Sequence, residues 1–218
     1  MTAKKTKPRT ADRILDAALV MFNRFGEPNV STNAIAAELG MSPGNLHYHF
    51  ASKDAITLAL FERFEASLLP VLASAQEVRD VEHAWLFVHM LFERIWQQRF
   101  IYRNLNDLLA KSRAIELRLQ RLLEAKGQSM SLLLAGLQHG GALRVSDAEA
   151  GAAAVTMVLL LNYWLSFEYV RDPRHALEDE AQSAALRRGA FQTLSVLLPW
   201  LEAGSRARLF ALSAQYDG

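Results

Sequence analysis

The 218-residue chain contains no cysteine, so it can form no disulfide and offers no thiolate to a metal ion or a substrate. It also has no large excess of either charge, since 24 lysines and arginines stand against 23 acidic residues. A nearly neutral chain carries no overall field that would indicate a nucleic acid or a membrane as its partner. We expect a cytoplasmic protein.

Long hydrophobic runs are also missing. The most apolar segment, 152–165, is shorter than the roughly 20 residues that cross a bilayer, and it is interrupted by Thr156 and Asn162. The basic N-terminal segment has no apolar core of the kind that a secretory signal needs. We therefore expect no membrane partner.

Positive charge is concentrated at the N-terminus. Residues 1–9 contain four basic side chains, Lys4, Lys5, Lys7 and Arg9, and no acidic one. Such a segment is either a solvated tail or a flexible arm that contacts DNA beside a DNA-binding module.

Apolar residues recur at spacings of three and four along the whole chain, which predicts an all-α fold. The first stripe runs from Ala11 to Phe25 and stops at Gly26. Ser31 and Ser42 are predicted to cap two further short helices. The remaining helices are expected over 53–75, 81–98, 101–110, 113–138, 147–171, 178–202 and 205–215, with Pro70 kinking or shortening the first of these.

The two short helices are separated by a very tight turn. Only Gly40 and Met41 lie between Leu39 and the Ser42 cap. Two short helices joined in this way make a helix-turn-helix, and the first helix completes a three-helix core. We therefore divide the chain into a basic flexible arm, a helix-turn-helix DNA-binding domain and a larger helical domain, over 1–9, 10–52 and 53–218.

The segment SPGNLHYHF, residues 42–50, is the second helix of this motif. At about 100° per residue, Leu46 and Phe50 point into the core. His47 and His49 lie about 200° apart, so they cannot bind one metal ion together. We predict neither a metal nor a cofactor here.

The outward face of this helix has chemistry suited to DNA. Gly44 lets the helix N-terminus approach a phosphate, which the free amides and the helix dipole attract. Asn45 can pair bidentately with adenine, and the start of the preceding helix crosses the DNA backbone in such motifs. The predicted contacts are Thr32, Asn33, Gly44, Asn45, His47, Tyr48, His49 and Lys53. Solvated surface is the alternative for each one singly.

The run RILDAALVMFNRFG…VSTNAIAAELGMSPGNLHYHFASKDAITLAL resembles the N-terminal domain of the TetR family of bacterial transcriptional regulators, over about residues 10 to 60. The resemblance implies a homodimer that inserts into successive major grooves of a double-stranded DNA operator. It also implies a C-terminal helical domain that dimerises and often holds a small effector. By position it adds Pro43 to the DNA contacts, to which we add the cap residue Ser42. His47 stands where the family most often has tyrosine, so this phosphate contact is expected to be weaker or pH-sensitive.

The effector pocket is predicted from residue chemistry. Trp85, His89, Phe92 and Trp96 fall along one edge of the helix expected over 81–98, and an apolar wall with one polar group is typical of a small-molecule site. Ordinary core packing is the alternative. The predicted lining residues are Trp85, His89, Phe92, Trp96, Tyr102, Asn106, Met130, Leu134, Asn162 and Phe167, and the ligand is expected to be largely apolar or aromatic.

The predicted helix 147–171 is apolar on two faces. Leu159, Tyr163 and Phe167 share one face, whereas Met157 and Leu161 share the other. Such a helix is either central in the core or shared with a second subunit. We expect a homodimer formed through 147–171 and 178–202; the alternative is that both helices lie inside a monomer.

Three functions are compatible with these features. The first is a dimeric repressor released by an effector. The second is a DNA-binding regulator without a small ligand, whose C-terminal domain only dimerises or binds a protein partner. The third is a helical enzyme, but no nucleophile–base pair, phosphate loop or pair of catalytic carboxylates can be recognised. We therefore expect no enzymatic activity.

Overall fold

The computed structural model describes residues 9–214, so the predicted basic arm lies outside the described residues except for Arg9. Within this range the chain folds into helices, short 3-10 turns and loops, with one isolated bridge between Leu143 and Leu201. The all-α prediction is confirmed. The helices are α1 (Thr10–Phe25), α2 (Thr32–Glu38), α3 (Pro43–His49), α4 (Lys53–Ala73), α5 (Val81–Gln97), α6 (Arg99–Arg103), α7 (Leu105–Lys111), α8 (Arg113–His139), α9 (Asp147–Arg171), α10 (Gln182–Ser195) and α11 (Ala203–Ala214).

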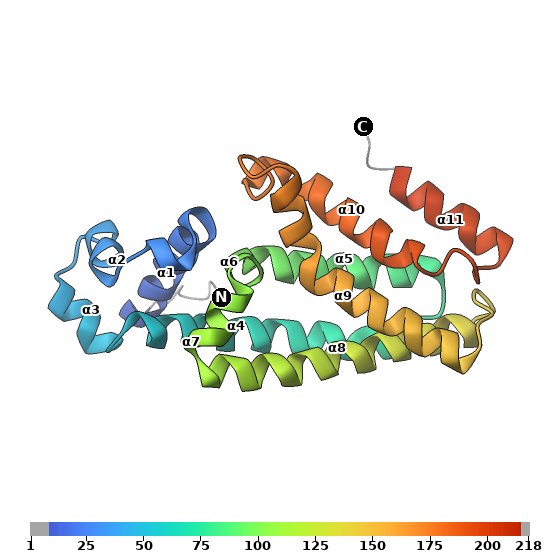
Figure 1. Ribbon diagram of the computed structural model, residues 1–218, viewed down its shortest axis with the longest axis horizontal. Coiled ribbons are helices and arrows are strands. Elements are labelled where there is room, and N and C mark those ends of the chain that lie inside the picture. Colours follow the sequence, from blue (N-terminus) through green and yellow to red (C-terminus); the bar gives the residue numbers. More distant parts are fainter. Residues whose placement is uncertain (1–8, 215–218) are drawn as a thin grey trace, which may run out of the picture.

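The molecule is elongated, with two unequal parts (Figure 1). Helices α1, α2 and α3 form a small unit at one end, and α4 extends from this unit along the larger bundle of α5 to α11. The core of the small unit consists of the fully buried side chains of Ile14, Phe22, Ile35 and Leu46. The three-helix unit of the sequence analysis is therefore present.

Local capping bonds set the start of each short helix. The Ser31 hydroxyl accepts from the Ala34 amide at 3.1 Å, and the Ser42 hydroxyl accepts from the Asn45 amide at 3.2 Å. Each bond satisfies an amide that has no partner within its own helix. The turn between these helices passes through Gly40, whose φ of 63° favours glycine.

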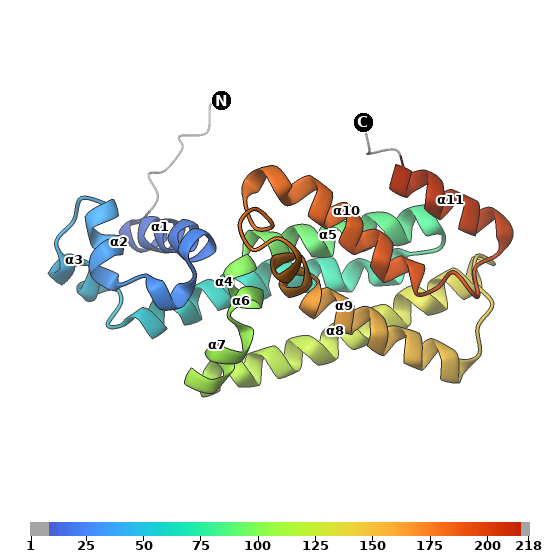
Figure 2. The ribbon, with the colours of Figure 1, turned by 45° about the horizontal axis from the view of Figure 1, so that its top comes forward.

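The larger bundle is built around α5, α8, α9 and α10. Helices α8 and α9 run antiparallel beside each other, and α10 packs against both α5 and α9 (Figures 1 and 2). At the far end, α8 passes extremely close to the loop before α5. A Cβ on Gly136 would lie 2.1 Å from the carbonyl oxygen of Val78, and one on Gly140 would lie 1.8 Å from that of Arg79. Only glycine permits this crossing.

Three predictions about individual helices are wrong. The range 101–110 is two helices, because the chain leaves α-geometry at Asn104 (φ −112°, ψ 23°), and asparagine is a weak helix former. The range 178–202, predicted as one helix, contains a short 3-10 helix (Asp179–Ala181) and α10. Helix α10 ends at Ser195 before a turn leading to Pro199, since a proline disfavours helix in the residue before it. Of the two effects predicted for Pro70, the early end is wrong, because α4 continues through Pro70 to Ala73, whereas the kink stays a prediction.

Helix α9 is the one described helix that is long and apolar enough to cross a membrane. Its packing against α6, α8 and α10 identifies it as a core helix instead. Met157, Leu161 and Trp164 lie on its buried face.

Candidate nucleic-acid interface and ligand groove

Helix α3 packs against the core on one face and is exposed to solvent on the other. Leu46 is fully buried, whereas Tyr48 is 85% exposed. Gly44, Asn45 and His47 are also exposed, and His49 is half-buried with its ring 5.3 Å from that of Tyr48. These side chains therefore lie on the faces of the helix that the 100° spacing per residue predicts. Their contact with DNA stays a prediction.

The hydroxyl of Ser42 is engaged in capping α3, and Pro43 is the first residue of that helix. Asn33 is exposed at the start of α2, next to the half-buried Thr32. A hollow of about 490 Å³ brings Thr32 and His47 together with Lys53 on the same side of the unit. Three of the predicted DNA contacts, from α2, α3 and the start of α4, thus lie around one hollow.

Lys53 has a structural partner that the sequence analysis missed. Its Nζ lies 3.0 Å from Oε1 of Glu27 and also donates to the carbonyl oxygen of Glu27 at 3.0 Å. Glu27 is almost completely buried, with 2% of its surface exposed. Lys53 therefore neutralises a buried carboxylate, in addition to the phosphate contact predicted for it.

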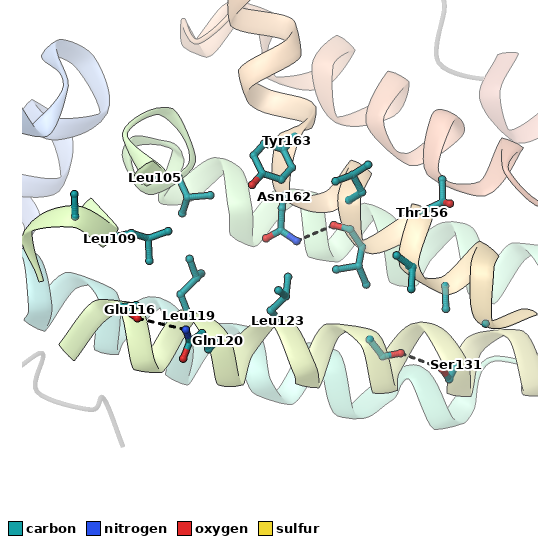
Figure 3. Close-up of a pocket in the computed structure, with 17 residues that line it drawn as sticks. Leu105, Leu109, Glu116, Leu119, Gln120, Leu123, Ser131, Thr156, Asn162 and Tyr163 are labelled. Carbon is teal, nitrogen blue, oxygen red and sulfur yellow. Dashed lines mark hydrogen bonds between the residues drawn. The ribbon is translucent and has the colours of Figure 1, made fainter. Parts of the chain in front are cut away.

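A groove of about 1020 Å³ opens between α7, α8 and α9 (Figure 3). Leucine side chains from all three helices converge on it, and polar groups are few. Its apolar walls include Leu105, Leu109, Leu119, Leu123, Val155, Val158 and Leu159; its polar groups include Glu116, Gln120, Ser131, Thr156, Asn162 and Tyr163. The volume is at the upper end of that typical of sites for small organic molecules.

Only Asn162 among the ten predicted pocket residues lines this groove. Asn106 and Phe167 are exposed, and His89 is half-buried on α5 near Glu93, with its Nε2 3.7 Å from Oε1 of that residue. The other predicted residues are buried in the hydrophobic core: Trp85, Phe92, Trp96, Tyr102, Met130 and Leu134. The structure therefore does not gather the predicted residues around one cavity, and ordinary core packing accounts for most of them.

The predicted edge of α5 retains two polar atoms without a hydrogen-bond partner in the described part of the chain, Nδ1 of His89 and Nε1 of Trp96. Burial is the main cause that lowers the pKa of His89. Neither His89 nor Trp96 lines the groove or the hollow beside Lys53.

The sequence contains only a weak signal for the groove residues that were not predicted. Leu123 and Leu159 are exposed leucines, and Gly127 and Gly151 place small residues on facing helices. Neither feature indicates a cavity until the pairing of α8 with α9 is known.

Two family models match the chain. One, described as "Bacterial regulatory proteins, tetR family", matches residues 14–60, and the other, described as "Bacterial transcriptional repressor", matches residues 63–209. The chain belongs to the TetR family. TetR-family regulators are DNA-binding transcription factors and not enzymes, they usually dimerise, and they act in the cytoplasm.

Solved structures of transcriptional regulators share this fold over most of the chain. A TetR-family transcriptional regulator from Marinobacter aquaeolei VT8 is 25% identical with a TM-score of 0.82, and the match covers 97% of this chain and 100% of that one. A putative transcriptional regulator from Saccharomonospora viridis, solved in complex with choline, is 20% identical with a TM-score of 0.66 over 88% and 97% of the two chains. The triclosan complex of SmeT, the repressor of a Stenotrophomonas maltophilia multidrug efflux pump, is 20% identical with a TM-score of 0.60 over 90% and 93%.

In this TetR-family chain the outer face of α9 is an exposed apolar row. Val155 is 71% exposed and Val170 is 79% exposed, and Leu159, Tyr163 and Phe167 continue the row between them. We call these five residues the α9 stripe. Its first three members also line the groove. By contrast, the leucines of the predicted partner segment, Leu186, Leu194, Leu197 and Leu201, are buried inside the same chain.

The DNA-binding unit of this regulator is tied to the larger bundle by more than α4. The side-chain nitrogen of Asn23 donates to the carbonyl oxygen of Gln97 at 3.0 Å, and its oxygen accepts from the Phe100 amide at 3.1 Å. The rings of Phe22 and Phe100 lie 5.4 Å apart. These contacts join α1 to the α5–α6 junction.

Proposed function

We propose that this TetR-family protein is a homodimeric repressor that leaves a palindromic operator when a largely apolar or aromatic small molecule binds in the groove between α7, α8 and α9. The groove is the observation that carries the proposal, because it combines a large apolar wall with a few polar groups. The description of the matched family model, a bacterial transcriptional repressor, supports repression as the output.

The surface of α2 and α3 is the proposed operator contact. Asn45 binds a base edge, while Tyr48, His47 and His49 donate to phosphates. Gly44 has no side chain, so the DNA backbone can approach the N-terminus of the helix closely. Thr32 and Asn33 contact the backbone where α2 crosses it. Ser42 and Pro43 act mainly by fixing the start of α3, and they lie at the same surface.

The α9 stripe is the proposed dimer contact. Five large apolar side chains in a row on one exposed helix face are typical of an interface. Because the stripe shares Val155, Leu159 and Tyr163 with the groove, a partner seated there would cover part of the groove mouth. The second predicted contact segment, 178–202, contributes little, since its leucines pack against the same chain.

Release of DNA then follows from differential affinity. An effector that binds better to a spacing of the two DNA-binding units unsuited to the operator lowers operator affinity by that difference alone. A hundredfold loss needs about 2.7 kcal/mol. Two connections can transmit the change, namely α4 and the contacts of Asn23 with the α5–α6 junction.

The experiment starts by selecting bound DNA from a random pool with the full-length protein. Selected DNA is then used to screen apolar and aromatic compounds for release. Gly127→Phe places a ring in the groove, where a Cβ at Gly127 would meet no atom within 4 Å. We expect Gly127→Phe to bind DNA normally but to lose release by the compound, whereas Gly204→Phe, which also has open space at its Cβ, behaves as wild type.

A regulator without a small ligand is the second candidate. The sharing of side chains between the stripe and the groove favours it, because a partner subunit could fill the groove itself. In that case Gly127→Phe would weaken dimerisation and DNA binding together, and no compound of the screen would release the operator. A monomer at operator-binding concentrations would refute the first candidate and leave the second only with a C-terminal domain that binds a protein partner.

A further inference from the structure

Lys126 of α8 is a buried amine at the back of the groove. Only 1% of its surface is exposed. Its Nζ donates to the Tyr102 hydroxyl at 2.9 Å and to the side-chain oxygen of Asn162 at 2.8 Å. The same Nζ lies 5.0 Å from the centre of the Tyr102 ring. All these partners are neutral groups.

Buried charges elsewhere in the described chain have a counter-charge. The carboxylate of Glu168, 1% exposed, pairs with Arg171 and Arg188, and that of Glu27 pairs with Lys53. No carboxylate within residues 9–214 forms such a pair with Lys126. An ammonium group buried without a counter-charge is costly, and burial lowers the pKa of Lys126 to about 7.

The amine is one side chain away from the groove. Asn162, which accepts from Lys126, is itself part of the groove wall, and its amide nitrogen is held by the carbonyl oxygen of Val158 at 2.7 Å (Figure 3). Leu123 and Gly127, on the same turns of α8 as Lys126, also line the groove. An ammonium has three N–H donors, and the structure shows acceptors for two.

We propose that the effector is an amphipathic anion whose carboxylate binds at Asn162 and Lys126 while its apolar part lies against the leucines of the groove. This proposal rests on the proposed function of the groove and specifies the class of its ligand. The ligand carboxylate supplies both the missing acceptor and the missing counter-charge, and it favours the protonated amine. The apolar walls of the groove then discriminate among ligands by the length and shape of their apolar part.

Three probes of equal chain length separate charge from apolarity, namely decanoate, 1-decanol and decyltrimethylammonium. Binding to the full-length protein is measured by titration calorimetry in the absence of DNA. We expect decanoate to bind at least about tenfold more tightly than 1-decanol, and the cation to bind most weakly. Equal affinity for decanoate and 1-decanol would overturn the anionic class and leave the groove as a ligand site. Failure of all three probes to bind would overturn both this proposal and the groove as an effector site.

Lys126→Met removes the amine and keeps an apolar chain of similar length. We expect it to bind 1-decanol as wild type does but to lose the preference for decanoate. Tyr102→Phe is the matched control, because it removes one hydroxyl partner and keeps the amine, so its preference for decanoate should persist. A preference that survives in Lys126→Met would overturn the assignment.

Proton uptake by the wild-type protein gives a second measurement that does not depend on the variant folding. At pH 8 a lysine with a pKa of about 7 is mostly neutral, so a carboxylate beside it should bring about half to one proton into the complex. Tyr102, the titratable group in contact with the amine, stays protonated because burial raises its pKa, and Glu116 is the carboxyl group of the groove wall. Titrations in two buffers of different ionisation enthalpy should show uptake with decanoate and none with 1-decanol. No difference between the two probes would contradict the proposal.

Discussion

The side chain of Asn23 bonds to the main chain of Gln97 at 3.0 Å, across the boundary between the DNA-binding unit and the larger bundle. The same carboxamide accepts from the Phe100 amide, so one side chain satisfies two main-chain groups of the α5–α6 junction. An apolar replacement would leave both groups in a largely buried place without a partner.

We expect Asn23→Ala to lower the free energy of unfolding by about 1–3 kcal/mol, because buried donors and acceptors without partners are costly. Urea unfolding followed by circular dichroism measures the change. Asn29→Ala is the control, since the Asn29 side chain makes an exposed bond to the carbonyl oxygen of Phe25 within the same unit; it should change stability by less than about 0.5 kcal/mol. Equal effects of the two variants would contradict a special role for Asn23.

Asn45→Ala should reduce binding to selected operator DNA more than binding to random DNA. A bidentate contact to adenine is worth about 1–3 kcal/mol of discrimination, whereas the phosphate contacts are independent of sequence. Fluorescence anisotropy with both DNAs at one salt concentration measures the ratio. A parallel loss on the two DNAs would show that Asn45 reads no base.

Lys53→Ala should destabilise the protein by about 1–3 kcal/mol, since it leaves the buried Glu27 carboxylate without its partner. The double variant Lys53→Ala with Glu27→Gln should recover part of this loss, because the remaining group is neutral. Any loss of DNA affinity that persists in the stabilised double variant is then due to the lost phosphate contact. It should appear as a decrease of about one in the slope of log binding constant against log salt concentration. Full recovery of DNA binding would assign Lys53 a purely structural role.

Two glycines of α8 should respond to alanine in opposite directions. Gly136→Ala must push against the Val78 carbonyl oxygen, 2.1 Å from the new Cβ, and we expect a loss of about 3 kcal/mol or more. Gly127→Ala meets open space in the same helix and should stabilise by about 0.5–1 kcal/mol. Thermal melts of both variants, run together, provide the comparison. A neutral Gly136→Ala would mean that α8 and the 78–79 loop separate easily.

Lys126 should make stability depend on pH in a defined window. Its pKa is about 7 in the folded protein and near 10.5 when unfolded, so between these values the unfolded chain binds more protons. Stability from this residue therefore rises with pH from about 7 to about 10, by at most about 1.4 kcal/mol per pH unit. The measurement is the difference in unfolding free energy between wild type and Lys126→Met across this range. A difference that is constant or falls with pH would contradict the burial of a largely neutral amine.

The DNA-binding unit could be predicted closely because its signals are local. Ser42 caps α3, Gly40 allows the turn, and Leu46 repeats the apolar spacing, so each element is encoded within a few residues. The family resemblance over this segment supports the same helix-turn-helix prediction, and the matching family model confirms it.

The groove could not be predicted because it depends on how distant helices pair. The spacing of Trp85 and Trp96 in the sequence is compatible with a pocket wall. In the structure α4, α8 and α10 pack against α5, so both tryptophans are buried in the core. Leu119 and Leu159 meet across a groove only because α8 lies beside α9. Lys126 did leave a signal, since it falls between Leu122 and Met130 in an apolar stripe where a charged residue is unusual.

Val155, Leu159 and Tyr163 belong to both the groove wall and the α9 stripe. A compound in the groove and a second chain on the stripe would touch the same three side chains, and any change that one makes in the dissociation constant of the other is matched by the same factor in return. The half-saturating dose of such a compound would then vary with the copy number of the regulator in the cell. A bacterium that made more of this protein would thereby shift its own threshold of response.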